Sequence, residues 1–203
     1  MPVDFYLNIL LAGILNGTVY GLMALGLSVI FGVMRIVNFA HGEMMVLGMY
    51  TAFVLNAWLG LDPLVTLPVV ALLLFAFGYG LQTSIVNRFI NVPEYQQFLL
   101  LLAVGIILTN ATLLGFGPDA RSIQVDYAFD SFDVGILILD KVRVYAAGTA
   151  VIIATALFLF FRFTRTGKAI RACADNFLGA QVVGLNIKRL YAVTFGIGAA
   201  CVG

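Results

Sequence analysis

The chain has 203 residues, of which 62% are hydrophobic and 10% are charged, and its formal net charge is +1. Soluble domains carry about 25% charged residues, so this chain cannot cover a water-exposed surface and a membrane is its expected solvent. The small net charge gives no indication of nucleic acid as a partner. Cys173 and Cys201 make neither a disulfide framework nor a metal-ligand set.

Long runs without a charged residue mark the expected membrane spans. A transmembrane helix needs roughly 20 apolar residues, and continuous runs of this length favour helices over barrel strands. We therefore expect an all-α polytopic bundle of about six spans, the last incomplete, in a single transmembrane domain over residues 1–203 that is truncated on its C-terminal side. The runs are 5–34, 44–61, 63–87, 95–118, 144–161 and, incomplete, 190–203.

Lysine and arginine divide unevenly between the two sides that alternating spans create. Eight fall on one side and three on the other, and the positive-inside rule places the richer side in the cytoplasm. The N-terminus is then outside, and it lacks the basic region of a signal peptide. The eight are Arg35, Arg88, Arg162, Arg165, Lys168, Arg171, Lys188 and Arg189, and the three are Arg121, Lys141 and Arg143.

The first span carries three glycines spaced by four, Gly13, Gly17 and Gly21. Small residues in this register let another helix approach closely. Close packing inside the bundle is the favoured interpretation, and a pore-lining face is the alternative.

The predicted periplasmic loop, residues 119–142, alternates apolar and polar side chains. The alternation runs over 123–129 and resumes over 132–138 after Asp130 and Ser131. Two such runs around a polar turn predict a small outer β-hairpin. It either shields the end of the bundle or forms a docking surface for an extracytoplasmic partner.

The stretch "RIVNFAHGEMM", Arg35 to Met45, contains the only histidine. It could be a reaction centre, an ion site or the bend between two spans, but one histidine cannot complete a three-ligand zinc site. We expect an inner turn that breaks at Gly42 and either stays at the surface or dips into the bundle as a broken helix. Arg35 and Glu43 are expected near the interface or facing each other, because a charge at mid-bilayer costs about 2.5–3.5 kcal/mol. Its candidate gate or path residues are Asn38, His41 and Glu43, and a purely structural turn remains the alternative.

The last inner connection, residues 164–188, shows helical spacing. After an expected break at Thr166-Gly167, one face has apolar or small residues at helical spacing, and another has Arg165, Lys168 and Arg171. The apolar or small residues are Ile170, Cys173, Phe177, Ala180 and Gly184. This pattern predicts a short amphipathic helix on the cytoplasmic face. It is an interfacial helix on anionic lipid, a basic loop that only sets topology, or a helix that binds a partner.

Two long motifs carry a family resemblance. "TGKAIRACADN…GAQVVGLNIKRLYAVTFGIGAACVG" and "NGTVYGLMALGLSVIFGVMRIVNFAHGEMMVLGMY" resemble LivH-like permeases, the membrane subunits of branched-chain amino acid ABC importers. The similarity covers about Leu15 to Gly203. Family loops of the EAA-x3-G type carry an acidic residue where Leu178 stands here.

The resemblance implies a bacterial inner-membrane subunit that works with a second permease, two cytoplasmic ATPases and a periplasmic binding protein. On that analogy, residues 164–188 form the cytoplasmic coupling loop. The residues it implies for ATPase coupling are Gly167, Lys168, Arg171, Asp175, Gly184 and Leu185.

The sequence shows no enzyme motif, cofactor site or metal site. Gly167-Lys168 is followed by alanine and lacks the upstream glycine of a P-loop, so ATP hydrolysis is expected on partners. A permease for urea or short amides is the first alternative, and a secondary transporter or channel is the second, although ionisable residues within the spans are few. An intramembrane enzyme ranks third.

Polar residues within the spans offer either a substrate path or helix–helix hydrogen bonds. They are Asn16, Thr18, Tyr20, Ser28, Asn110 and Thr112.

Overall fold

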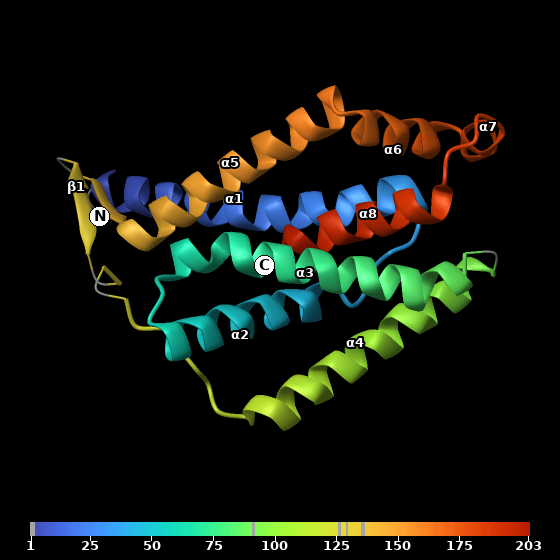
Figure 1. The fold of residues 1–203 in the computed structure, drawn as a ribbon. Coiled ribbons are helices and arrows are strands. Elements are labelled where there is room, and N and C mark those ends of the chain that lie inside the picture. The colour runs from blue at the N-terminus through green and yellow to red at the C-terminus, as the bar shows by residue number, and fades with distance from the viewer. Residues whose placement is uncertain (1–2, 91, 126, 129, 135–136) are drawn as a thin grey trace.

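The computed structural model describes residues 3–90, 92–125, 127–128, 130–134 and 137–203. Helices dominate, and the only sheet in these residues is one two-stranded hairpin (Figure 1). The elements are α1 (Val3–Met34), α2 (His41–Leu59), α3 (Pro63–Ser84), the 3-10 helix η1 (Val86–Arg88), α4 (Glu94–Phe116), β1 (Ser131–Val134), β2 (Leu137–Asp140), α5 (Lys141–Phe163), α6 (Arg165–Asp175), α7 (Phe177–Val182) and α8 (Ile187–Ala200).

Four helical segments among the described residues are long and apolar enough to cross a membrane. They are Phe5–Met34, Pro63–Arg88, Tyr95–Phe116 and Lys141–Phe163. Each coincides with a predicted run, which confirms a mostly helical, polytopic membrane protein. Helix α2 has 19 residues and begins with two polar side chains, and α8 has 14 residues. The count of six spans therefore stays a prediction.

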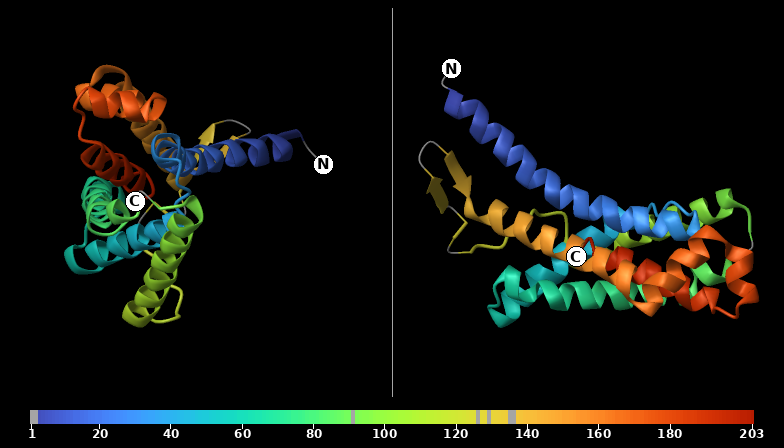
Figure 2. Two further views of the ribbon diagram at one scale, coloured as in Figure 1. Left: turned by 90° about the vertical axis from the view of Figure 1, so that its right-hand side faces the viewer. Right: turned by 90° about the horizontal axis from the view of Figure 1, so that it is seen from above.

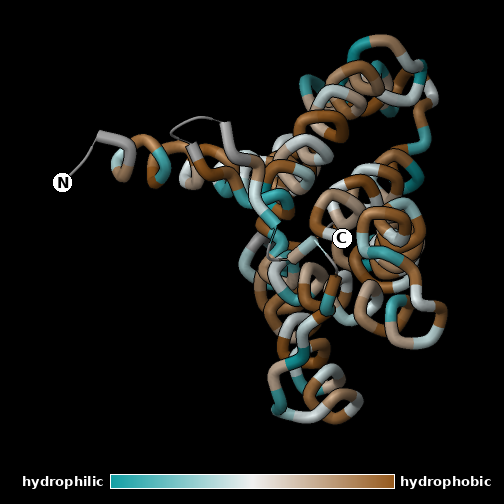
Figure 3. The backbone as a smooth tube through the Cα atoms, turned by 90° about the vertical axis from the view of Figure 1, so that its left-hand side faces the viewer, coloured by the Kyte–Doolittle hydropathy of each residue, from teal (hydrophilic) through white to brown (hydrophobic). Residues whose placement is uncertain are grey.

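The bundle has two distinct ends. In Figure 1 the hairpin and the start of α1 lie at one end, which we call the hairpin end. Helices α6 and α7 and the connection between α3 and α4 lie at the other, which we call the α6 end. Figure 2 shows the first half of α1 projecting away from the other helices. Hydrophobic residues occupy outward-facing turns of the helices in Figure 3, as a lipid-exposed surface requires.

Helices α3 and α8 pack closely at the centre of the described chain. A Cβ added at Gly78 would lie 2.7 Å from the Cβ of Ala199, and one added at Gly196 would lie 3.0 Å from the ring of Phe75. Glycine at these positions lets the two backbones approach, as small residues do in membrane helix pairs. The buried Phe195 and Leu74 fill the same contact.

The outer hairpin forms in the predicted loop but in a different register. Strands β1 and β2 are antiparallel, with Ser131 opposite Asp140, so both strands follow Asp130 and the predicted turn at Asp130-Ser131 does not separate them. The described residues of the predicted first arm, 123–125 and 127–128, form no strand. The Asp130 carboxylate instead pairs with Lys141 Nζ at 2.7 Å, at the start of α5. Alternation alone does not determine where the chain turns.

Two hydrogen bonds attach this loop to the bundle. The Tyr127 hydroxyl donates to Asp62 Oδ1 at 2.9 Å, and the Ile138 amide donates to Asn8 Oδ1 at 2.9 Å. Burial and the hydrogen bond to Asp62 raise the pKa of Tyr127 to about 12. Because Asp62 also accepts from the Leu64 amide as the N-cap of α3, the loop is fixed to the start of that helix.

Candidate functional site

The chain reverses direction at the end of α1. Arg35 has φ of +55°, a left-handed conformation that residues other than glycine rarely adopt, and its amide donates to Phe31 O at 2.8 Å. The next five residues are not helical. Among them Ile36, Asn38 and Ala40 are buried while the intervening side chains are exposed. One side of this stretch therefore packs against the bundle and the other side is exposed. Residues 35–43 are called the re-entrant segment below.

This segment carries the start of α2 deep into the bundle. His41 Nε2 lies 3.1 Å from Met23 O, and Met23 is eleven residues before the end of α1. At 1.5 Å per residue this is about 16 Å along the helix. On the other side, a Cβ added at Gly105, midway along α4, would lie 3.7 Å from Ala40 Cα. Helix α2 thus begins about halfway along its neighbours, as Figure 1 also shows.

Asn38 and His41 hold this segment in place. Asn38 Oδ1 accepts from the Ala40 amide at 3.1 Å, and its Nδ2 lies 3.7 Å from Met44 Sδ. The imidazole of His41 is buried, and its Nδ1 has no partner among the described residues. A Cβ added at Gly26 would lie 3.4 Å from His41 Cε1, so a glycine on α1 makes room for the ring.

Glu43 differs from these two because it is half-buried and turned toward α4. Its Cγ would lie 3.8 Å from a Cβ added at Gly105, and it forms no ion pair within the described chain. We expected this carboxylate near the end of a span, but it lies about halfway along the bundle. The described residues contain no cluster of three metal-ligating side chains. Glu43 is a single half-buried carboxylate beside Gly105.

Helix α6 folds back tightly on the end of α5. Thr164 ends α5, and its hydroxyl accepts from the Gly167 amide at 3.0 Å and donates to Phe160 O at 2.7 Å. A Cβ added at Gly167 would collide with the backbone of Phe160 and Phe161. The break therefore lies at Thr164, not at Thr166-Gly167, and Gly167 is needed for the close approach.

The predicted amphipathic helix is two helices. Ile170, Cys173 and Ala180 are buried, as their spacing predicted, whereas Phe177 and Gly184 are exposed. Helix α6 ends at Asp175, before the last three of these positions. Asn176 then starts α7, since its Oδ1 accepts from the Gly179 amide at 2.8 Å. A shallow groove on the outer face of α6 is lined by Lys168, Arg171, Ala172, Ala174 and Asp175.

Large apolar side chains on and after α7 face away from the bundle. Leu178 is 70% exposed, Val182 88% and Val183 80%. Exposed apolar residues beside the basic side chains of α6 form a surface suited to a protein partner. We call Lys168, Arg171, Asp175, Leu178, Val182 and Val183 the α6–α7 face.

The last two predicted coupling residues connect this face to α8. Gly184 has φ of +84°, which glycine adopts without strain, and the Leu185 amide donates to Ala180 O at 3.0 Å. Leu185 packs against the buried core. The Cys173 thiol also forms a hydrogen bond with Tyr191 of α8, and burial raises the pKa of this thiol. Helix α6 is therefore attached to both α5 and α8.

The predicted packing glycines of α1 face outward. No heavy atom of another part of the described chain comes within 4 Å of a Cβ added at Gly13, Gly17 or Gly21. Close packing occurs one turn further along, where a Cβ added at Gly26 would lie 2.8 Å from Gly198 O. The stripe of three thus stays a predicted packing surface for a helix not seen among these residues.

Three of the six polar span residues are hydrogen-bonded within their own helices. Thr18 donates to Leu15 O, Asn110 to Ile106 O and Thr112 to Leu108 O. None of these three bonds joins two helices, so the helix–helix alternative has no support from them. Asn16, Tyr20 and Ser28 are exposed on α1.

Sequence reasoning missed Gly26, Gly105 and Tyr191. Gly26 and Gly105 flank the start of α2, and Tyr191 binds Cys173. Gly26 follows the stripe by five residues rather than four, so its different direction was the available signal. No local signal pairs Gly105 or Tyr191 with segments so distant in sequence.

Comparisons with known proteins agree on one kind of protein. The family model "Branched-chain amino acid transport system / permease component" matches residues 9–203. The "High-affinity branched-chain amino acid transport system permease protein BraD" of Pseudomonas aeruginosa is 29% identical over 98% of this chain and 69% of its own length. The Escherichia coli protein of the same description, LivH, is 28% identical over 97% and 68%. The "Probable branched-chain amino acid transport permease protein LivH" of Methanocaldococcus jannaschii is 24% identical over 96% and 63%. No solved structure matches the chain.

Proposed function

The chain belongs to the family of branched-chain amino acid transport system permease components, and from this premise we propose that it is a membrane-spanning permease subunit of an ATP-driven importer. Its cargo is branched-chain amino acids delivered by a periplasmic binding protein. Two cytoplasmic ATPases supply the energy, and a second permease subunit completes the membrane pathway. The observation that carries this proposal is the family match over residues 9–203, which includes the re-entrant segment and the α6–α7 face.

The α6 end is assigned to the cytoplasm of a bacterial cell and the hairpin end to the periplasm. Support comes from the eight lysine and arginine residues predicted on the inner side, of which Lys168, Arg171 and Lys188 are exposed at or beside α6 and α7. This orientation places the N-terminus in the periplasm. The outer hairpin then lies where a binding protein approaches.

The α6–α7 face is the proposed contact for an ATPase. It combines exposed cations, which pair with carboxylates, and exposed apolar side chains, which gain free energy when a partner covers them. Movement of this face reaches the membrane helices because Gly167 and Cys173 attach α6 to α5 and α8. Coupling needs such an element, whose position both the ATPase and the pathway influence.

The re-entrant segment is the proposed gate. Non-helical backbone at membrane depth is tolerated where it is buried in protein or lines a cavity. Asn38 and His41 hold this segment against α1 and α2, while the half-buried Glu43 is available to a passing ammonium group. Alternating access would then shift this segment relative to α1 and α4.

Reconstitution of the whole transporter in liposomes tests this proposal. We expect uptake of labelled leucine that needs ATP and the binding protein and persists when a protonophore removes the proton gradient. Uptake that ignores ATP and follows an imposed proton gradient would identify a secondary transporter instead. Labelled urea serves as the matched solute, and ATP-driven uptake of urea without leucine would identify the alternative cargo.

A further inference from the structure

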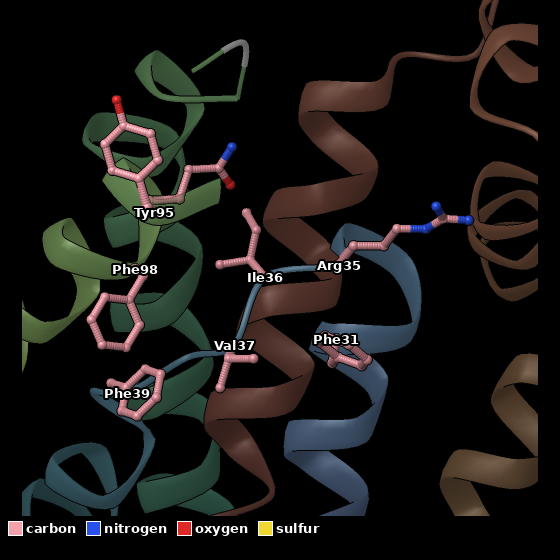
Figure 4. Close-up of a pocket in the computed structure, with 8 residues that line it drawn as sticks. Phe31, Arg35, Ile36, Val37, Phe39, Tyr95 and Phe98 are labelled. Carbon is pink, nitrogen blue, oxygen red and sulfur yellow. The ribbon is translucent and has the colours of Figure 1, made fainter. Parts of the chain in front are cut away.

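A groove of ≈ 390 Å³ lies at the α6 end, between the last turn of α1 and the first turns of α4. In Figure 4 the re-entrant segment runs along it, with α1 side chains on one flank and α4 side chains on the other. Four of its lining residues belong to the re-entrant segment, but the candidate gate residues Asn38, His41 and Glu43 and the predicted coupling residues do not line it. Its lining is Phe31, Arg35, Ile36, Val37, Phe39, Tyr95, Gln97 and Phe98.

The lining changes from polar to apolar along the groove. Figure 4 shows Tyr95 nearest the connection that precedes α4, and Phe39 and Phe98 farther into the bundle. The rings of Phe39 and Phe98 pack edge to face with centroids 4.6 Å apart. Phe31 and Val37 are exposed, so the deeper part offers an open apolar surface.

The polar part contains two groups whose interactions are incomplete. The exposed Arg35 has no carboxylate partner among the side chains that the structure describes. Gln97 is 6% exposed, and its Nε2 donates to Val92 O at 2.9 Å, which leaves the buried Oε1 without a partner in the described chain. A buried acceptor left unpaired costs about 1–3 kcal/mol. The groove therefore has an unpaired acceptor and an aromatic floor. Arg35 lies at its rim with the guanidinium directed away from Tyr95 and Phe98 in Figure 4, and this exposed, flexible side chain turns toward the groove to meet a bound group.

We propose that this groove binds a phospholipid of the membrane leaflet at the α6 end. The phosphate pairs with Arg35, a hydroxyl or ammonium of the headgroup satisfies Gln97 Oε1, and an acyl chain lies along Phe31, Val37 and Phe98. Arginine is well suited to phosphate oxygens, and basic pockets between membrane helices bind lipid headgroups. A free amino acid fits less well, because none of the described side chains that line the groove has a carboxylate for its ammonium group.

Native mass spectrometry of the complete transporter, released from membranes in mild detergent, tests this site. We expect Arg35→Asn to reduce the population that retains a phospholipid by about fivefold or more, as loss of a charge-assisted contact should. Asparagine tolerates the left-handed backbone at this position, so the fold should persist. Arg35→Lys should restore retention, and Arg88→Asn, at an exposed arginine of the same end outside the groove, should leave it unchanged.

A photo-crosslinking residue at position 37 then identifies the occupant directly. A phospholipid adduct supports the proposal, whereas an adduct with another polypeptide would show that a protein covers the groove and would overturn it. Retention in Arg35→Asn equal to that of the unsubstituted transporter would also overturn it. The inference uses the proposed function only to name the inner leaflet. Because lipid retention is measured without transport, failure of one proposal is distinguishable from failure of the other.

Discussion

Two of the connections at the α6 end, the re-entrant segment and residues 164–186, differ in where their polar groups go. The re-entrant segment turns into the bundle, buries Asn38 and His41 and starts α2 about halfway along α1. The segment 164–186 stays on the surface of the helix bundle and exposes Lys168 and Arg171. A gate must be enclosed by the helices that it closes against, while a contact with a partner must be accessible. The proposed gate and the proposed ATPase contact accordingly use different connections.

The largest effect is expected where the segment 164–186 begins at the end of α5. Gly167→Val places side-chain atoms against the backbone of Phe160 and Phe161, which cannot move without unwinding the end of the helix. We expect loss of ATP-driven leucine uptake and loss of co-purified ATPase. Gly148→Val is the matched control, because Gly148 lies on α5 with no heavy atom within 4 Å of an added Cβ. Equal effects of both substitutions would show that α6 does not depend on this close approach.

A charge reversal on the outer face is expected to separate hydrolysis from transport. Arg171→Glu leaves the buried side of α6 intact but repels a carboxylate on the ATPase. We expect a fall of about tenfold in uptake per ATP hydrolysed, within the range of about 5–150-fold that coupling free energies produce. Arg88→Glu is the control at the same end of the bundle. Normal coupling in Arg171→Glu would remove this residue from the ATPase contact.

Sequence reasoning predicted the segment 164–186 better than the re-entrant segment. The spacing of Ile170 and Cys173 identified the buried side of α6, because helical periodicity reports which face is covered. It did not reveal the break at Asn176, whose capping role competes with helix continuation. The depth of Glu43 was missed since the cost of a buried charge argued for the interface, and the cost falls when the group lies beside polar or open space.

The glycines show the same limit. Gly13, Gly17 and Gly21 have the expected motif but meet no helix of the described chain, whereas Gly26 and Gly198 lack it and touch. Motif spacing reports that a helix can be approached closely. Which helix approaches depends on tertiary contacts between distant segments, and a local pattern contains no information about them.

Two glycines of α1 test the packing around the re-entrant segment. Gly26→Val would meet Gly198 O at 2.8 Å and Cys201 Cβ at 2.9 Å and would crowd His41, whereas Gly17→Val meets nothing within 4 Å. Overpacking costs about 1–3 kcal/mol, so we expect a lower thermal midpoint for the purified transporter with Gly26→Val. Gly17→Val should leave this midpoint unchanged unless a further helix covers the stripe, and a matching decrease would indicate such a helix.

The smallest effect is expected at Glu43, which is only half-buried. Glu43→Gln keeps the volume beside Gly105 and removes the charge, so packing and expression should persist. If the carboxylate contacts the ammonium group of the cargo, uptake should fall about two- to fivefold, the size expected for a partly solvated charge contact of up to about 1 kcal/mol. The loss should appear in the concentration dependence of leucine uptake, with ATP hydrolysis unchanged. Met44→Leu, a volume-conserving change at the adjacent buried position, is the control for packing. Uptake by Glu43→Gln equal to that of the unsubstituted protein would mean that the re-entrant segment acts as a structural turn. The re-entrant segment and the segment 164–186 would then differ in packing alone.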